Sequence, residues 1–351
     1  MRFIHIADVH LGAKPEAGKL YSYNREREIW DTFGKVLDVC EKEQIPLLLI
    51  AGDLFHRQPL LRELKEVDYL FSRLTVTKVV FIAGTHDYIK ENSYYGSFVW
   101  CDNVYPILSS SLDFVEIEEL DIAVFGCSYH QREILDNRLE ETIELTNKRY
   151  NILLGHGGDA NHMPFSIPNM KKTEYDYIAL GHIHKPEILI NHKMAYAGAL
   201  EPTDIGDIGK HGYMLGELKE EGAELTFIPI AGREYIQKQI QISPEMTQYE
   251  LKDLLVDIRQ ELGQQNLYIF ELVGRYNPEN VWRVEELDEL GNIVKIVNNT
   301  KVNYNIEQLV SANQDNLLGA YIRSYGAVED GSIEYMALCM GIEAIEETKK
   351  G

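Results

Sequence analysis

Five short clusters of histidine and aspartate, each placed directly after a short apolar run, constrain this chain more than any other feature. The runs cover residues 2–7, 46–51, 78–83, 150–154 and 175–180. The clusters that follow are Asp8 with His10, Gly52 with Asp53, Gly84 to Asp87, Gly155 with His156, and Gly181 with His182 and His184. Any one cluster could occur at a strand end by chance, but five in series indicate a shared functional site.

The apolar runs are rich in Ile, Leu and Val, which is typical of strands buried on both faces. In open α/β sheets, ligands bind beyond the carboxyl ends of the strands, so five strands can deliver five clusters to one place. Glycine recurs in four of the clusters. It allows the backbone to turn sharply and to approach an ion closely.

The residue types in the clusters indicate a metal site. Carboxylate together with neutral imidazole suits divalent ions such as manganese, iron or zinc, and the absence of cysteine from the clusters argues against a Cys-ligated structural zinc site. Asp-x-His and His-x-His put two side chains on the same side of an extended segment. Asp53 could bridge two ions, and two ions can drive in-line displacement at phosphorus by an activated water.

The order Asp-x-His, Gly-Asp, Gly-x-His-Asp, Gly-His and Gly-His-x-His resembles the calcineurin-like metallophosphoesterase superfamily over residues 1–229. Within it, residues 5–12, 52–56 and 179–185 look like SbcD-type DNA repair exonucleases, the branch that includes the nuclease subunits of double-strand-break repair complexes. The resemblance implies an α/β metallophosphoesterase sandwich, with two central mixed β-sheets flanked by helices. We expect this nuclease domain over residues 1–232 and a smaller α+β capping domain over residues 233–351.

The resemblance also implies roles for single residues. The expected metal ligands are Asp8, His10, Asp53, Thr85, His156, His182 and His184. Asp8, His10, Asp53 and His184 would surround the first ion, and Asp53, His156 and His182 the second. His86 would be the catalytic histidine that meets the scissile phosphate and protonates the leaving oxygen, with Asp87 orienting it. His56 is a further candidate, for positioning the DNA backbone.

Thr85 is the one departure from the family pattern, which has Asn before the catalytic histidine. An Asn carbonyl oxygen ligates the second ion, whereas a hydroxyl ligates weakly and has a shorter reach. Two interpretations stay open. In the first, a lineage-specific variation, Thr85 or a water fills the position. In the second, the second ion is bound more weakly, so that activity is low or metal-dependent, or the substitution is engineered.

The predicted function is that of a DNA nuclease dependent on two divalent ions, which hydrolyses phosphodiesters by a metal-activated water. The resemblance implies a 3′–5′ exonuclease with possible endonuclease activity, acting with an SbcC-type coiled-coil ATPase in DNA repair. Mn²⁺ is the expected metal, with Fe²⁺, Zn²⁺ or Mg²⁺ as alternatives. Two other functions stay open: a phosphodiesterase acting on a small nucleotide or other phosphoester, and a non-catalytic scaffold with the same fold.

The formal net charge of −22 is the main objection to a DNA-binding role. A protein that holds DNA unaided usually has a basic surface. Two divalent ions would add about four positive charges to the crevice. Basic residues near the clusters could meet a DNA backbone: Arg25, Arg27, Arg57, Arg62, Lys171, Lys172 and Lys185. The net acidity nevertheless predicts help from a DNA-binding partner.

Composition also bears on location and assembly. At 351 residues the chain is long enough for two domains, and it has no apolar stretch that could span a membrane. The first predicted strand leaves no room for a cleavable signal peptide, and the four cysteines lack paired spacing. We therefore expect a cytoplasmic protein with no membrane contact, and the resemblance adds a homodimer.

Hydrophobic spacing gives the coarse layout. Helices are predicted over residues 25–43 and 62–74, and strands over 193–200, 211–218 and 223–230 that close a second sheet. Farther along, strands are predicted near 236–242, 267–273 and 293–297, and helices over 247–262, 308–325 and 333–345. The last helix either docks on the capping domain or binds a partner.

Overall fold

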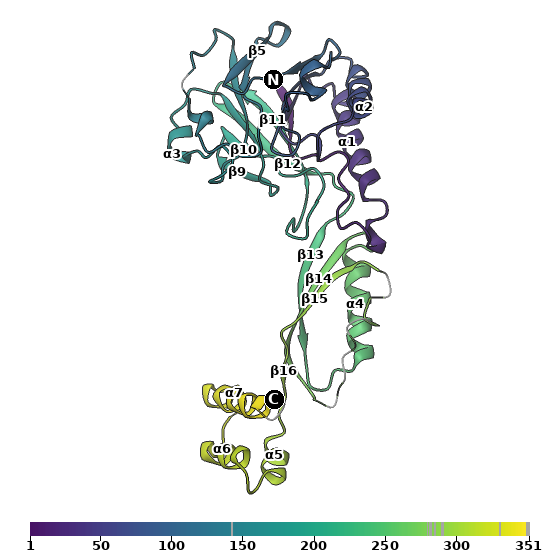
Figure 1. Cartoon of the computed structure of the whole chain (residues 1–351), viewed down its shortest axis with the longest axis vertical. Helices are drawn as coiled ribbons and strands as arrows, with labels where there is room; N and C mark the ends of the chain where they lie inside the picture. The colour runs from purple at the N-terminus through teal and green to yellow at the C-terminus, as the bar shows by residue number, and fades with distance from the viewer. Residues whose placement is uncertain are drawn as a thin grey trace. The chain divides into compact units, whose positions relative to one another are not determined.

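The computed structural model describes residues 1–141, 143–278, 280, 283, 286–288, 291–329 and 331–348. The chain divides into two compact units (Figure 1). The first comprises Met1–Ile236 with Gln265–Leu267, and the second comprises Gln237–Gln264 with the chain from Tyr268 onward. The capping role predicted for residues 233–351 stays a prediction.

The first unit contains a mixed sheet in the order β12-β11-β1-β2-β3-β4. Its parallel part consists of β1 (Arg2–Ile6), β2 (Leu47–Ala51), β3 (Lys78–Ile82) and β4 (Val104–Pro106). On the other edge, β11 (Gly212–Lys219) pairs antiparallel with β1, and β12 (Gly222–Pro229) pairs antiparallel with β11. The first three strands are almost wholly buried, as their apolar sequences predict.

A second mixed sheet has the order β5-β6-β7-β8-β10-β9. Its strands are β5 (Asp113–Ile117), β6 (Ile122–Gly126), β7 (Tyr150–His156), β8 (Tyr177–Gly181), β9 (Glu187–Ile190) and β10 (Met194–Tyr196). The central run β6-β7-β8-β10 is parallel, and both edges are antiparallel. The predicted sandwich of two mixed sheets flanked by helices is confirmed.

Apolar side chains from both sheets form a common core. From the first sheet, Phe3, Leu49 and Val80 are buried in the same cluster as Ile152 and Tyr177 of the second. The opposite face of the first sheet packs against α1 (Arg25–Lys42) and α2 (Leu61–Ser72) in another cluster. These helices lie on one side of the unit, and the short α3 (Ile167–Met170) lies on the other (Figure 1). The two sheets are thus the middle layers of the unit.

One part of the predicted layout is wrong. Residues 211–218 and 223–230 were expected in the second sheet, but β11 and β12 extend the first. Periodicity shows that a segment is a strand but carries no information about the edge on which it pairs. β11 pairs with β1 of the first sheet, with Ile4 opposite Leu215.

Most of a smaller sheet belongs to the second unit. This sheet contains β13 (Tyr235–Ile242), β14 (Leu267–Tyr276) and β15 (Ile293–Asn298), with β16 (Lys301–Val302) paired to β14, and α4 spans Gln248–Leu262. Three helices follow, α5 (Ile306–Ala312), α6 (Leu317–Tyr325) and α7 (Ile333–Thr348). The single helix predicted over 308–325 is therefore two helices. Asn316 separates them because its side chain accepts from Gly319 N and so starts α6 as an N-cap.

The helices also bear on membrane insertion. Among the described residues, no helix has both the length and the apolar character needed to cross a bilayer.

Candidate metal centre

The predicted site residues meet at the carboxyl ends of strands from both sheets. The first sheet brings Asp8 and His10 after β1, Asp53 after β2, and Thr85 and His86 after β3. The second brings His156 at the end of β7, and His182 and His184 after β8. Groups of these side chains place their ligand atoms within 4.8 Å of one another, including Asp8 with His10 and His184, and Asp8 with Asp53 and His156.

The backbone at this site is strained. Asp8, His10, Asp53 and His182 all have positive φ angles, between 49° and 91°. Non-glycine residues seldom adopt this conformation, and such residues cluster at functional sites. The loop after β2 supports the turn after β1, because Asp8 N donates to Gly52 O at 3.2 Å and His10 N donates to Asp53 O at 3.0 Å.

One half of the cluster brings two imidazole rings together. His10 Nε2 lies 3.2 Å from His184 Nε2 and 3.9 Å from Asp53 Oδ2. His10 is completely buried, and burial lowers its pKa well below the usual value. A neutral imidazole that points its nitrogen at a second imidazole and at a carboxylate presents the donor set of a divalent cation.

The other half is built on His156. Its Nδ1 donates to Ala51 O at 2.8 Å, so Nε2 is the atom directed at Asp53 Oδ2, 3.4 Å away. Within the described residues, this buried Nε2 has no hydrogen-bond partner. A cation between Nε2 and the carboxylate would satisfy both groups, so the residues present fit a metal ion.

The ionisation of the two groups agrees with this fit. Burial by itself lowers the pKa of His156, but the contact with Asp53, the charge of Asp8 and the hydrogen bond to Ala51 together outweigh it and raise that pKa to about 9. Burial by itself raises the pKa of Asp53, but His156 and then His10 outweigh it, so that the pKa lies well below its usual value. Asp53 is therefore ionised. A metal ion would compete with a proton for the Nε2 atom of His156.

Two glycines make the close approach possible. A Cβ at Gly84 would lie 2.3 Å from Asp53 Oδ1, and a Cβ at Gly52 would lie 2.3 Å from His156 Nδ1. Gly52 also has a φ of +84°. Any side chain at either position would displace a candidate ligand.

His86 and Asp87 differ from expectation in one respect. His86 Nδ1 lies 3.1 Å from the His56 carbonyl oxygen, and His86 N donates to Asp53 Oδ1 at 2.8 Å. We expected Asp87 to orient the His86 ring. In the described residues its carboxylate instead accepts from Gly84 N, Phe55 N and Tyr95 Oη, at 2.7, 3.1 and 2.9 Å. Two of these donors are backbone N–H groups, so the buried Asp87 carboxylate fixes the backbone of the loop that carries His86.

Thr85 and His56 lie at the rim of the cluster. Thr85 Oγ1 donates to Asp53 Oδ2 at 3.2 Å, so its hydroxyl is next to the predicted bridging carboxylate. His56 Nδ1 is 3.4 Å from His10 Nδ1, and its ring stacks on that of His86 with centroids 4.8 Å apart. Both residues are therefore within the site.

Sequence reasoning missed two carboxylates and a histidine. Asp159 Oδ2 is 2.7 Å from His182 Nε2, and Asp207 Oδ2 is 3.0 Å from His184 Nδ1. His162 Nδ1 also contacts Asp159, at 2.8 Å. All three lie in loops outside the five clusters, so no strand-end pattern marks them. The only signal was the Asp-x-x-His spacing from 159 to 162, which is too common to single out.

A model of the calcineurin-like phosphoesterase family matches residues 1–186. This chain belongs to that family.

Several relatives of this phosphoesterase have been named. The uncharacterized metallophosphoesterase YhaO of Bacillus subtilis is 30% identical over 239 residues, 61% of this chain and 57% of the relative. The DNA double-strand break repair protein Mre11 of Aeropyrum pernix is 28% identical over 246 residues, 60% and 56% of the two chains. The SbcD subunit of the SbcCD nuclease of Staphylococcus epidermidis is 26% identical over 268 residues, 66% and 70% of the two chains. The matched segments thus span just over half the length of the first two relatives.

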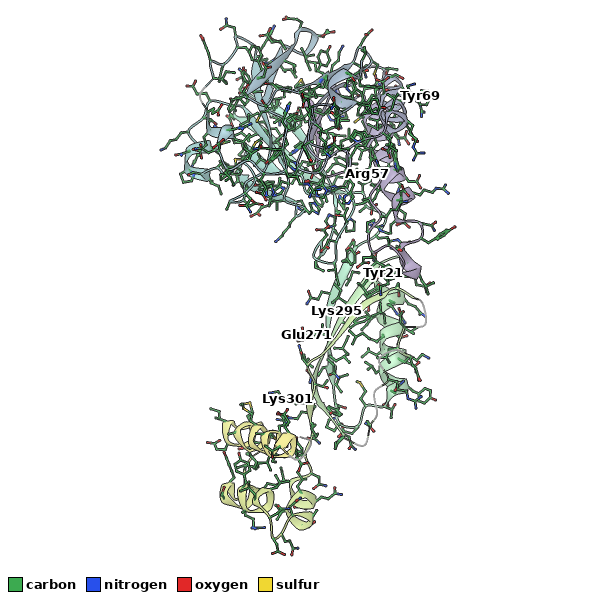
Figure 2. The ribbon with its side chains drawn as sticks, viewed as in Figure 1. Tyr21, Arg57, Tyr69, Glu271, Lys295 and Lys301 are labelled. Atoms are coloured by element: carbon green, nitrogen blue, oxygen red, sulfur yellow. The ribbon has the colours of Figure 1, made fainter. Side chains whose placement is uncertain are left out.

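A cleft of about 490 Å³ opens beside the candidate metal centre of this phosphoesterase. Its lining includes His56, Arg57, Gln58, Thr85, His86, Tyr88, Lys90, Arg132, Glu133 and His162. Arg57, labelled in Figure 2, is paired with Glu63 by two hydrogen bonds of 2.7 and 3.0 Å. Arg25 was expected near DNA, but it is fully buried and paired with Glu28 and Glu201, so it is not available to a DNA backbone.

Proposed function

We propose that this chain is a two-metal DNA nuclease that hydrolyses phosphodiester bonds. One observation carries the proposal: Asp8, His10, Asp53, His156 and His184 come from both sheets, and their ligand atoms lie within a few ångströms of one another, as given above. Three imidazoles and two carboxylates in a largely buried cluster are costly to assemble without cations to share them.

The chain's residues divide between two ion positions. Asp8, His10 and His184 would hold the first ion, His156 and His182 the second, and Asp53 both, with Thr85 beside the second. When bound, a pair of divalent ions supplies an activated water and neutralises charge on the phosphoryl oxygens. Mn²⁺ is the ion that we propose, because the mixed imidazole and carboxylate set suits a borderline metal better than Mg²⁺.

His86 would handle the proton of the leaving group. Its Nδ1 faces the His56 carbonyl oxygen, which can only accept, so Nδ1 carries a hydrogen and Nε2 is the atom left for substrate. In the protonated ring, Nε2–H can donate to the leaving oxygen. His86 is exposed and lines the cleft, where a phosphodiester can reach it.

DNA is the proposed substrate because two of the relatives are named as a DNA repair protein and as a nuclease. We further propose 3′–5′ exonuclease action with possible endonuclease activity, a homodimer, a cytoplasmic location and an SbcC-type ATPase partner. The net charge of −22 supports the need for such a partner, since DNA would be repelled by most of the surface. Residues 233–351 would form the capping domain.

The test is the release of nucleotides from linear DNA by the full chain in Mn²⁺, in Mg²⁺ or with a chelator. His86→Ala is compared at equal protein concentration, and both proteins are also given a small phosphodiester. We expect Mn²⁺-dependent release that falls by about 10²–10⁴-fold in His86→Ala, the range for loss of a general acid. His130→Ala is the matched control, because His130 is exposed and lies outside the cleft.

Two results would contradict the proposal in different ways. Hydrolysis of the small phosphodiester without release from DNA would favour the small-substrate phosphodiesterase. Bound metal with no hydrolysis of either substrate, even with an SbcC-type partner present, would favour the scaffold.

A further inference from the structure

Each histidine of the last cluster contacts a carboxylate that lies outside the five clusters. His182 is held at Nε2 by Asp159, and His184 is held at Nδ1 by Asp207. The two carboxylates therefore contact opposite ring nitrogens. Because a neutral imidazole has one N–H and one lone pair, the nitrogen that faces a carboxylate carries the hydrogen and the other nitrogen keeps the lone pair.

We propose that Asp159 and Asp207 are positioning residues that decide which nitrogen of each histidine binds metal: Nδ1 of His182 and Nε2 of His184. The inference rests on the proposed two-metal function. For His184 the geometry agrees directly, because the assigned Nε2 lies 3.2 Å from Nε2 of the other first-ion histidine, His10. A carboxylate behind a ligating imidazole also raises its basicity as a ligand.

The loop of Asp159 is built to aim this carboxylate. Asp159 Oδ1 accepts from Asn161 N at 2.8 Å and from His162 N at 3.1 Å, which fixes the rotation of the side chain. Gly158 N donates to His162 O at 2.7 Å. Met163 is buried, and its backbone N donates to Ile134 O at 2.7 Å. The turn is therefore anchored at its closing end. Oδ2 is the oxygen that contacts His182, and it shares His162 Nδ1 with Oδ1.

A second constraint comes from Gly157 in the same loop. A Cβ at Gly157 would lie 2.2 Å from His162 O, so only glycine allows the turn to close this tightly. The loop backbone thus sets the orientation of the Asp159 side chain.

Asp207 is held differently. Its Oδ2 accepts from Thr203 N at 2.8 Å, from Asp204 N at 3.0 Å and from Thr203 Oγ1 at 3.3 Å. His184 Nδ1 lies 3.0 Å from Oδ2 and 3.1 Å from Oδ1. Oδ2 thus serves the loop backbone and also shares the imidazole with Oδ1. In Asp159 the two tasks are divided between the two oxygens. Because of this difference, we expect the Asp→Asn substitution to have opposite effects on the histidine tautomer at the two positions.

Asp159→Asn should reverse the tautomer of His182. The amide oxygen must stay with the two backbone N–H groups, so the amide NH₂ faces His182 Nε2. That nitrogen must then accept, and the hydrogen moves to Nδ1, which can no longer ligate. In Asp207→Asn the amide oxygen takes the place of Oδ2 and accepts from the Thr203 and Asp204 N–H groups and from His184 Nδ1, once the ring turns away from the amide NH₂ at the Oδ1 position. The ring of His184 therefore keeps its tautomer.

The experiment titrates the full-length chain with Mn²⁺ by calorimetry and records the electron paramagnetic resonance signal of a coupled manganese pair. We expect two ions in the unaltered chain. In Asp159→Asn one of the two affinities should fall by about 10–100-fold, with loss of the coupled signal. Asp207→Asn should keep both affinities and the signal. Circular dichroism of each variant checks that the fold is intact.

The outcomes separate this inference from the function on which it rests. Two ions bound equally well by Asp159→Asn and the unaltered chain would overturn the inference and leave the two-metal function standing. A third ion that is lost in His162→Ala would also overturn it, because Asp159, His162 and His182 would then be a separate cation site. No Mn²⁺ bound by the unaltered chain would overturn both.

Discussion

At the scale of single residues, the site depends on close contacts that only certain residue types permit. Gly52 and Gly84 leave no space for a Cβ beside His156 and Asp53. Asp53 itself has a φ of 50°, and the loop after β3 contacts it through Thr85 Oγ1 and His86 N. The identity of these residues was evident from the sequence, because aspartate, histidine and glycine at strand ends form a recognisable pattern. Asp159 and Asp207 were not evident, because contacts between loops have no local pattern.

Thr85→Asn tests whether the hydroxyl weakens the second ion position. An amide carbonyl oxygen is a stronger ligand than the hydroxyl and reaches farther, so we expect the affinity for the second ion to rise on the order of tenfold. Metal content after dialysis and calorimetry provide the measurement. Thr75→Asn, at an exposed position on the same unit, is the control. Equal occupancy in Thr85→Asn and the unaltered chain would show that Thr85 or a water already fills the position.

At the scale of elements, apolar runs predicted every strand that carries a site residue. The predicted run 46–51 is β2 (Leu47–Ala51), and 78–83 is β3 (Lys78–Ile82). The prediction omitted β4, β5, β6, β9 and β16. β4 and β16 have only three and two residues, β5 and β9 are short and partly exposed, and no cluster follows β6. Pairing partners were also beyond the sequence pattern. They depend on contacts between distant segments, such as β11 with β1.

A buried ion pair connects α1 to the loops beside the site. Arg25 at the start of α1 contacts Glu201, whose other oxygen accepts from Thr32 Oγ1 and Gly232 N, each at 2.6 Å. Glu201→Gln should lower the free energy of unfolding by about 3 kcal/mol, because an amide must oppose either the guanidinium or these two donors. Urea denaturation measures the change.

The control for that substitution is Glu119→Gln in the exposed pair between Lys78 and Glu119. Solvent screens this pair, so the free energy of unfolding should hardly change. A loss at Glu201 no larger than the loss at Glu119 would show that the buried pair does not stabilise the fold.

At the scale of the whole molecule, the chain combines a recognisable phosphoesterase unit with a second unit whose role the sequence left open. Residues 1–186 match the family, and they contain every predicted site residue. The second unit has its own helical core, formed by Leu318, Ile322, Leu338 and Ile342. Apolar spacing predicted that helices would occur there, but the break between α5 and α6 depends on Asn caps, which spacing does not reveal.

Leu338→Ala tests whether this core is energetically separate from the metal centre. We expect it to destabilise the cluster of α5, α6 and α7 by about 2–5 kcal/mol, the cost of truncating a buried leucine. Hydrogen exchange should speed up in α6 and α7, while Mn²⁺ affinity stays unchanged. Ile333→Ala, at a 76% exposed position, should alter neither property. A fall in Mn²⁺ affinity in Leu338→Ala would show that the two units are coupled.

The division of the candidate ligands between two sheets has a consequence for biogenesis. A chain in which one sheet has formed carries Asp8, His10 and Asp53, or His156, His182 and His184, and neither set alone can hold both ions. Competence to hydrolyse a phosphoester would therefore appear only after the sandwich has closed. A folding intermediate of this phosphoesterase would be inactive.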